Sequence, residues 1–565
     1  MIVYERNGVK IRNTIKCISV LFIAELVLLF LAFTAPQAFA LASNNIPLDS
    51  PVYSYIEKLA GFGLIDSDVK GVRPYSRSEA ARLYLEAEGN LSRLGGTVPS
   101  FSTDVMQRLR ELLPREVSLH GAPKKAPLAD YNPLSAAKLR YVYLDGVPRS
   151  YNRDVHDPAH QSAFGFIGGD LRPLGAGGTV HQTGMEGTPL LENNDGVIYD
   201  RGSSVDFRWT MEGYVADKVA AAIEPRLLHT PLHDRFDLQK GYVKIGGGGL
   251  ELEAGRDANW FGPGFRGATT LTNNAKNFDL IKLSSPEPLD VGWVKRYLGD
   301  FKYAFILSRF DATGSGADYR RPYFIGLKLS LKPKPWFEIG GNLVRQEGGP
   351  GFSGKVSLKD QIFGGGDNDH INSIAGVDLR FRIPWLRNTE VFGEYAGEDS
   401  ASFWPIVESY VAGFFIPRLT ADGRNDLRFE YYWGSVMAYG DWQFPAGYVY
   451  HGMTPGHSQG GAAQDFFLRY SHWFSPRNNL ALEYFHTERG NVGRLTVNSD
   501  GRFDPSGVLQ AVERKNAARL FWNFPLIGDL DANLMYGWER INNFNLVAGA
   551  KQTNQLLKVD LSYRY

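Results

Sequence analysis

The chain has 565 residues, equal numbers of basic and acidic side chains (61 each), and 13% aromatic residues. This neutral balance gives no basic footprint for a nucleic-acid partner. The only cysteine is Cys17. Once a leader containing it is removed, disulfides, cysteine zinc sites and cysteine nucleophiles are excluded.

Residues 1–40 have the layout of a signal peptide. A basic stretch at 6–16 precedes an apolar stretch at 18–33, and an A-x-A cleavage site ends at Ala40. The apolar stretch is short for a spanning helix, although an uncleaved anchor stays open as the alternative. We predict an exported protein whose first mature residue is Leu41.

Residues 41–125 predict a small helical module. In SPVYSYIEKLAGFGLI (50–65) apolar residues recur at helical spacing. Ser76 or Ser78 can cap a second helix, and a third is expected over about 102–113, ended by Pro114. The segment resembles one S-layer homology unit. Two roles stay open: a plug or strut that packs on the rest of the chain, or a tether to peptidoglycan or another wall polymer.

Residues 126–565 alternate with a period of two, as in VDLRFRI (377–383), and turn residues separate the segments. Such strands fit either a soluble sandwich or a membrane barrel. Segments approaching ten residues, heavily charged second faces and aromatic residues at segment ends favour the barrel, with its apolar face toward lipid. We therefore predict an all-β membrane protein, a large antiparallel transmembrane β-barrel of 16–18 strands. Water or a plug must fill an interior of that size.

The stretch GRDANWFGPGFRGATTLTNNAKNFDLIKL (255–283) concentrates side chains that suit sugar recognition. Aromatic faces stack on sugar rings, while amides and guanidinium groups pair with hydroxyls. The alternative is a loop folded inward by Gly and Pro, with asparagines capping its turns. The candidates for sugar contact or for shaping the lumen are Trp260, Phe261, Arg266, Asn273 and Asn274.

This stretch resembles the W-x-G-P-G and T-N-N-A signature of the capsule assembly protein Wzi family. NSIAGVDLRFRIPWLRNTEVFGEYAGED (372–399) and GYVYHGMTPGHSQGGAAQDFFLRY (447–470) are similar to two further family blocks, in family order. Phe261 departs from the pattern, because a second tryptophan is common there. The resemblance covers most of 45–565.

That resemblance implies an outer-membrane barrel of about 18 strands with a periplasmic helical module. It also implies a lectin-like role that attaches or assembles capsular or other surface polysaccharide, without catalysis or cofactor. A porin or solute channel, with the helical module as a cell-wall tether, is the alternative function.

GHSQG (456–460) matches the G-x-S-x-G pattern of a hydrolase nucleophile elbow. That elbow needs a buried strand before Ser458 and a helix after it, whereas the flanking sequence predicts a loop and another strand. An outer-membrane hydrolase is therefore a rival function only. A polar lumenal cluster that includes His457 and Asp465 is the milder functional interpretation.

The sequence offers no convincing metal site. GGGDNDH (364–370) lacks the invariant glycine and the closing glutamate of a calcium loop. We expect an ordinary loop there, with no metal bound.

The chain ends in the alternating stretch LLKVDLSYRY (556–565). We predict that it is the closing barrel strand and that its apolar positions face lipid. Tyr563 and Tyr565 resemble the signal that barrel-assembly machinery recognises at the end of such strands.

Overall fold

The body of the structure is a closed antiparallel β-barrel. The computed structural model describes residues 41–564 except 95–97, 157–178, 248, 290–291, 317–318, 353–369, 402–403, 436–437, 442–443, 445, 491–495, 498–507 and 510. Within this described part, eighteen strands close the barrel, as predicted. These strands are β2 (Ala129–Asp145), β5 (Gly202–Val215), β6 (Val219–His229), β7 (Asp234–Gly247), β8 (Leu250–Asp257), β10 (Phe278–Ser284), β11 (Asp300–Arg309), β12 (Tyr323–Lys334), β13 (Phe337–Glu347), β14 (Ile371–Ile383), β15 (Thr389–Ala401), β16 (Trp404–Ile416), β17 (Asn425–Gly434), β18 (Ala463–Ser475), β19 (Asn478–Arg489), β22 (Glu513–Ile527), β23 (Leu530–Asn542) and β24 (Lys551–Arg564).

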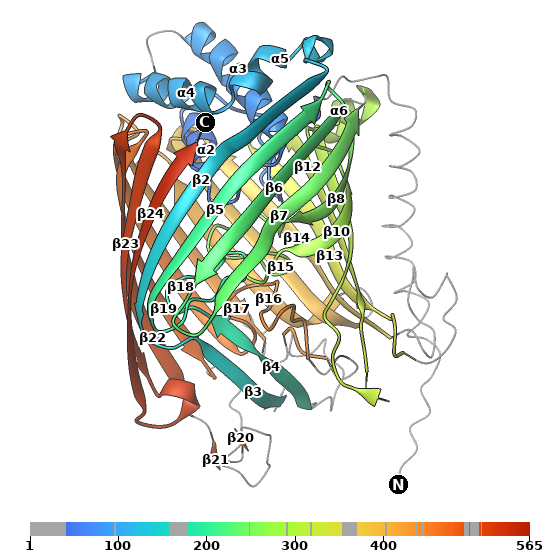
Figure 1. Ribbon diagram of the computed structural model, residues 1–565, viewed down its shortest axis with the longest axis vertical. Helices are drawn as coiled ribbons and strands as arrows, with labels where there is room; N and C mark the ends of the chain where they lie inside the picture. The colour runs from blue at the N-terminus through green and yellow to red at the C-terminus, as the bar shows by residue number, and fades with distance from the viewer. Residues whose placement is uncertain are drawn as a thin grey trace.

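Each barrel strand pairs with the next barrel strand along the chain, which gives an up-and-down meander (Figure 1). The first strand, β2, pairs with β5 on one side and with the last strand, β24, on the other. In this closing pair Tyr563 lies opposite Ala137. Closure leaves no free edge in the sheet, as a bilayer requires, because lipid offers no hydrogen-bond partners.

The barrel wall separates charged from apolar residues. In β14, Asp378 and Arg380 are buried on the inner face, whereas Val377, Leu379 and Phe381 are 37–49% exposed on the outer face. This arrangement confirms the prediction that the apolar face points outward. It is the reverse of a soluble sandwich, whose apolar faces pack together inside.

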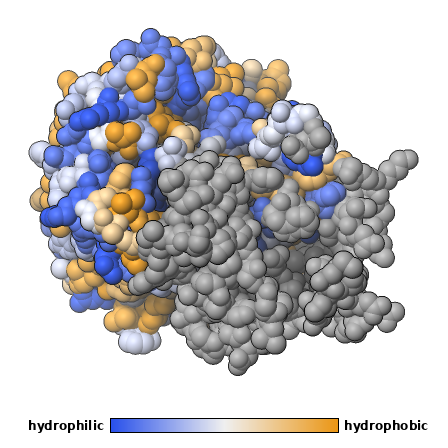
Figure 2. All heavy atoms as spheres, turned by 90° about the horizontal axis from the view of Figure 1, so that it is seen from below, coloured by the Kyte–Doolittle hydropathy of each residue, from blue (hydrophilic) through white to orange (hydrophobic). Residues whose placement is uncertain are grey.

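The two ends of the barrel differ in their connections. At one end strands are joined by short turns, such as 476–477 and 528–529, whereas at the other end connections such as 258–277 and 435–462 are long. The hairpin of β3 (Arg149–His156) and β4 (Thr179–Gly187) also lies at the long-loop end (Figure 1). Viewed from that end, the coloured part of the surface mixes hydrophilic and hydrophobic side chains (Figure 2).

Helices from the N-terminal part of the chain cover the short-turn end (Figure 1). They share an apolar core to which the barrel contributes Trp473. No helix in the described part of the chain is long and apolar enough to cross a bilayer. The helices are α2 (Val52–Gly61), α3 (Arg77–Leu94), α4 (Ser100–Leu112), α5 (Pro114–Leu119) and the 3-10 turn η2 (Pro123–Lys125).

Local chemistry explains where these helices begin. The Ser76 hydroxyl oxygen accepts a hydrogen bond from the Glu79 N–H at 3.0 Å, so Ser76 is the cap of α3. Pro114 follows α4 but begins α5, because a proline at the first helical position loses no intrahelical hydrogen bond. Further helical segments lie between barrel strands: α6 (Gly292–Leu298), η4 (Pro384–Leu386) and η5 (Phe544–Leu546).

Candidate functional site

Three connections fold back into the lumen and meet there. They are residues 188–200, residues 258–277 and the described parts of 435–462. The second turns inward at Gly262, whose φ of 123° favours glycine. A Cβ at this position would lie 2.8 Å from Glu394 Oε2 on the barrel wall. The Gly-Pro-Gly sequence therefore lets the chain pass close to the inner face.

Trp260 and Phe261 are buried where the helical region meets the lumen. They form β9 (Trp260–Phe261), which pairs with β1 (Val72–Arg73). Trp260 is 4% exposed, and the Arg73 guanidinium lies 4.6 Å from the centre of its indole ring. Phe261 is fully buried in an aromatic cluster with Phe278 and Phe324. Both predicted residues thus face protein.

Arg266 joins three parts of the structure through carboxylates. Its Nε donates to Asp465 Oδ2 at 3.0 Å, and its Nη1 donates to Glu192 Oε2 at 3.2 Å. Its backbone N–H donates to Glu430 Oε2 at 2.7 Å, and its guanidinium lies 4.1 Å from the ring centre of Phe485. The side chain of Arg266 therefore holds segment 188–200 and strand β18, and its backbone N–H holds strand β17.

The predicted asparagines connect the same lumenal segments. Asn273 Nδ2 donates to the Asn193 carbonyl and to Asp195 Oδ1, both at 3.0 Å. Asn274 Nδ2 donates to the Thr454 carbonyl at 3.1 Å. These amide donors, expected to meet sugar hydroxyls, are engaged by the protein itself.

His457 and Asp465 complete the buried set. The imidazole of His457 is 1% exposed and stacks on Tyr432, with ring centres 3.6 Å apart. The backbone N–H of His457 donates to Tyr439 Oη at 3.0 Å. Burial lowers the pKa of His457 to about 3, although Asp465 acts in the opposite direction. The ring is therefore neutral near pH 7.

The structure brings these seven lumenal candidates into one buried region, and their contacts favour the role of shaping the lumen. Sequence reasoning missed Glu192, Asn193 and Glu430, which hold the same segments. The LENNDG stretch (191–196) carried turn chemistry as a signal. Such polar turns have the same sequence signature whether they lie on the surface or inside a barrel.

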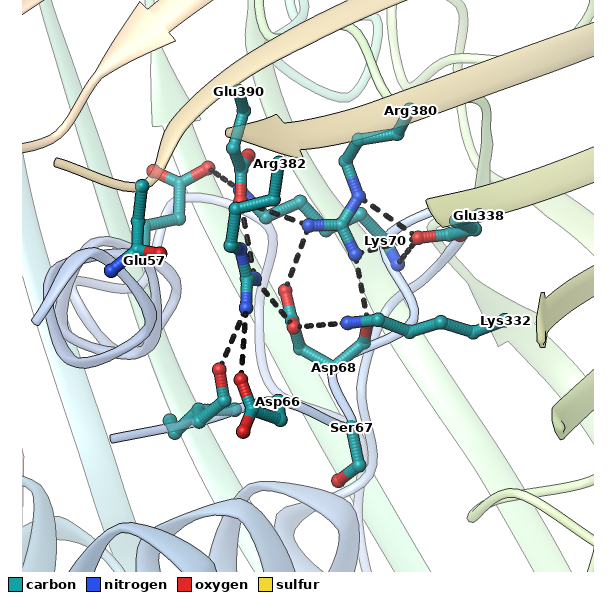
Figure 3. Close-up of polar contacts among 12 residues, drawn as sticks. Glu57, Asp66, Ser67, Asp68, Lys70, Lys332, Glu338, Arg380, Arg382 and Glu390 are labelled. Atoms are coloured by element: carbon teal, nitrogen blue, oxygen red, sulfur yellow. Dashed lines mark hydrogen bonds and ion pairs between the residues drawn. The ribbon is translucent and has the colours of Figure 1, made fainter. Parts of the chain in front are cut away.

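A second set of buried ion pairs lies nearer the helices and centres on Asp68 (Figure 3). Its Oδ1 accepts from Lys332 and from Arg382, both at 2.7 Å, and its Oδ2 accepts from Arg380 at 3.1 Å. Burial alone would raise the pKa of Asp68, but Arg380, Arg382 and Lys332 hold the pKa well below its usual range. Asp68 is therefore charged and joins the segment after α2 to the barrel wall.

Two lysines strengthen this attachment. Lys70 donates to Glu390 at 2.6 Å and to Glu57 at 3.0 Å (Figure 3). On α2, Lys58 is 1% exposed and lies 2.8 Å from Asp426 of β17. Breaking a buried pair from one side leaves an uncompensated charge, so these pairs resist separation of the helices from the barrel.

A cavity of about 470 Å³ remains between α2 and the lumenal segments. Of the predicted residues, Trp260, Arg266 and Asn273 line it, together with Tyr53 of α2 and Arg469 of the wall. Its volume lies in the range of small-molecule sites.

The loop around Ser458 does not form a nucleophile elbow. Strand β18 follows it where a hydrolase needs a helix, and Ser458 Oγ accepts a hydrogen bond from Gln459 Nε2 at 3.3 Å. Within the described ranges, no group of three or more His, Cys, Asp or Glu could hold a metal ion. Most of the 364–370 stretch lies outside those ranges.

The predictions for the two chain ends are only partly within the described residues. Tyr563 lies on β24, opposite Ala137 and Leu530 of the neighbouring strands. Tyr565 and the predicted signal peptide, residues 1–40, lie outside the described residues.

Comparison with known proteins identifies similar sequences and structures. The sequence profile of a family described as capsule assembly protein Wzi matches residues 173–556. No curated protein matches the chain. The structure of Wzi from Escherichia coli is described as an outer-membrane protein involved in group 1 capsule assembly and a carbohydrate-binding β-barrel. It is 14% identical and covers 93% of this chain and 99% of its own, with a TM-score of 0.62, which shows a shared fold.

Two Pseudomonas aeruginosa barrels also match, at lower similarity. OprD is 11% identical, covering 78% of this chain and 97% of its own, with a TM-score of 0.41. OpdQ is 9% identical, covering 77% and 97%, with a TM-score of 0.40.

Proposed function

This chain belongs to the capsule assembly protein Wzi family, and we propose that, as an outer-membrane β-barrel of this family, it binds a capsular or related surface polysaccharide at the cell surface. The observation that carries the proposal is the filled lumen. Ion-paired segments occupy the barrel interior at two levels, around Arg266 and around Asp68. Such a barrel suits holding a polymer on one face better than passing it through. The carbohydrate binding described for the similar Escherichia coli barrel supports the same function.

The orientation follows from the two ends of the barrel. Outer-membrane barrels have short periplasmic turns and longer extracellular loops. The helices lie at the short-turn end, so we place them in the periplasm and the long loops outside. Polysaccharide would then meet the long-loop end (Figure 1).

The mechanism is adhesion without catalysis. Many weak contacts to a repeating polymer gain strength from the repeats, because each bound unit raises the effective concentration of the next. In this account the lumenal set, including Trp260, Arg266 and His457, fixes the inner ends of the loops. A disordered loop would lose more entropy on binding than a loop that is already fixed.

Three rival or additional roles have separate tests. A porin predicts ion conductance in planar bilayers, whereas a filled barrel predicts little. A hydrolase predicts that Ser458→Ala abolishes turnover of a lipid or glycan substrate. A wall tether predicts that purified sacculi capture the folded protein through its helical region.

The direct test is binding of purified capsular polysaccharide to the full-length protein in nanodiscs. We expect saturable binding whose apparent affinity rises with the number of repeat units. Heat-denatured protein serves as the control. Absence of binding to every capsule preparation by folded protein would contradict the proposal.

A further inference from the structure

The cavity between α2 and the lumenal segments carries more positive than negative side chains. Twelve of its lining residues are Arg or Lys and six are Asp or Glu. Two of the carboxylates each serve two cations: Glu483 pairs with Arg469 and Arg519, and Asp560 pairs with Arg140 and Lys558. Glu390 and Asp465, which lie behind the lining, also pair with Lys70 and Arg266. The positive surplus therefore rests on cations such as Arg73, which forms no ion pair with a carboxylate in the described part of the chain.

Arg73 shows this surplus most clearly. Its Nη2 donates to the carbonyls of Gly262 at 3.0 Å and Gly264 at 2.5 Å, and its guanidinium stacks on Trp260. Its Nε has no hydrogen-bond partner within the described part of the protein. Burial lowers the pKa of Arg73, as expected for a charge with too little compensation. A largely buried charge that has only neutral partners is costly, so an anion in the cavity would stabilise this arrangement.

An aromatic ring stands among these cations. Phe265 lies on a lumenal segment yet is 38% exposed, and it lines the cavity. The guanidinium groups of Arg428 and Arg469 lie 4.5 and 5.5 Å from its ring centre. An aromatic face can pack against the C–H groups of a sugar ring, while guanidinium forks pair with carboxylate or phosphate oxygens.

We propose that this cavity binds one anionic saccharide unit, with its ring against Phe265 and its carboxylate or phosphate paired by Arg73 and Arg469. A volume of about 470 Å³ accommodates such a unit but not a long polymer. At the mouth, the side chains of Asp49 and Asp531 are 53% and 35% exposed, so the cavity opens at the end that carries the helices, opposite the long-loop face proposed to hold the polymer. The saccharide part of this inference rests on the proposed function; the anionic part rests on the charges alone.

The test is calorimetric titration of the full-length protein in detergent with glucuronate, glucose 6-phosphate, inorganic phosphate and glucose. We expect saturable binding of at least one acidic sugar at one site per chain, with affinity at least about tenfold above that for glucose. The double substitution Arg73→Gln with Arg469→Gln should weaken binding at least about tenfold. Arg201→Gln is the matched control, because Arg201 is 69% exposed and does not line the cavity; it should leave binding unchanged.

Several results would overturn the proposal. These are no saturable binding of either acidic sugar, equal affinity for glucose, or an equal loss in the Arg201→Gln control. Equal affinity for inorganic phosphate and glucose 6-phosphate would overturn the saccharide part.

A second measurement needs no variant. Wild-type crystals soaked in tungstate should show an anomalous peak between Arg73 and Arg469, and absence of that peak contradicts the site. If the protein binds the polymer but no acidic sugar, only this inference is contradicted. If it binds an acidic sugar but no polymer, only the proposed function is contradicted.

Discussion

At the scale of single residues, Arg266 joins carboxylates from three parts of the barrel interior. Its side chain is 4% exposed, so water has little access to take over the hydrogen bonds that the guanidinium makes. The fold therefore depends at this point on one guanidinium whose planar fork meets two carboxylates, and lysine could not reproduce that geometry.

We predict that Arg266→Ala loosens the lumenal segments by about 3–5 kcal/mol, because Asp465 and Glu192 keep their buried charges without this partner. The stability of Arg266→Lys should lie between that of Arg266→Ala and that of the wild type. Hydrogen exchange followed by mass spectrometry should show faster exchange in 188–200 and 258–277. Arg201→Ala, on the exposed surface, is the control, and unchanged exchange in Arg266→Ala would refute the role.

His457 gives a pH dependence with a defined sign. The folded imidazole stays neutral down to a pKa of about 3, while an unfolded histidine takes up a proton near pH 6.5. Between these values the unfolded state binds more protons, so stability falls as the pH falls. At about pH 5 the cost is on the order of 2 kcal/mol.

The measurement is the thermal unfolding temperature of the barrel in detergent at about pH 7.5 and at about pH 5. Unfolding is detected by the change in electrophoretic mobility that heating causes in the barrel. The wild type should lose more stability between the two values than His457→Gln, which has no imidazole to titrate. An equal loss in both proteins would assign the effect to other groups, and the prediction would fail.

At the scale of elements, the helical region is attached to the barrel by charge as well as by packing. Asp68 is fully buried against three cations of β12 and β14 (Figure 3). Its neighbour Asp66 has a side chain that is 55% exposed and lies 3.9 Å from Arg382. The two aspartates therefore form a matched pair for testing what burial adds to an ion pair.

We predict that Asp68→Asn frees the segment after α2, because Lys332, Arg380 and Arg382 lose a charged partner that offsets their burial, a cost of about 3–5 kcal/mol. Limited proteolysis should cleave residues 41–125 faster than in the wild type. Asp66→Asn should behave like the wild type. Equal cleavage of Asp68→Asn and wild type would show that the network does not hold the helices in place.

The closing strand β24 carries the prediction made from the end of the sequence. Tyr563 lies opposite Ala137 of the first barrel strand, so β24 closes the sheet. We predict that deletion of Tyr565 impairs insertion into the outer membrane, since the terminal aromatic is the proposed signal for barrel assembly. Pulse-labelled cells should then accumulate unfolded precursor, and normal assembly kinetics would contradict this role.

At the scale of the whole molecule, alternation predicted the barrel and the outward apolar face, because each strand reports its own two faces. VDLRFRI is an example, with Val377, Leu379 and Phe381 outside as expected. The lumenal arrangement was beyond such reasoning. Asp68 finds its partners more than 260 residues away, and nothing local distinguishes it from a surface aspartate.

The sequence predicted which residue types the candidate site contains, but not whether their side chains are exposed to a ligand. Trp260, Arg266 and Asn273 belong to a stretch whose chemistry suits sugars, and the sequence left open whether they contact a ligand or close the lumen. Burial and pairing decide such a question, and both depend on segments far apart in the chain. Phe265, which the sequence analysis did not single out, is the aromatic ring left partly open to the cavity.

Ion-paired segments fill the lumen of this outer-membrane barrel, and we propose that it therefore holds polysaccharide without conducting solutes. Single-channel recording of the purified wild-type protein in planar bilayers tests it most directly, with a general porin as the positive control. We expect a silent trace for the wild type, and openings only in a variant that weakens both levels, Asp68→Asn with Arg266→Ala. Steady, porin-like conductance steps from the wild type would contradict it.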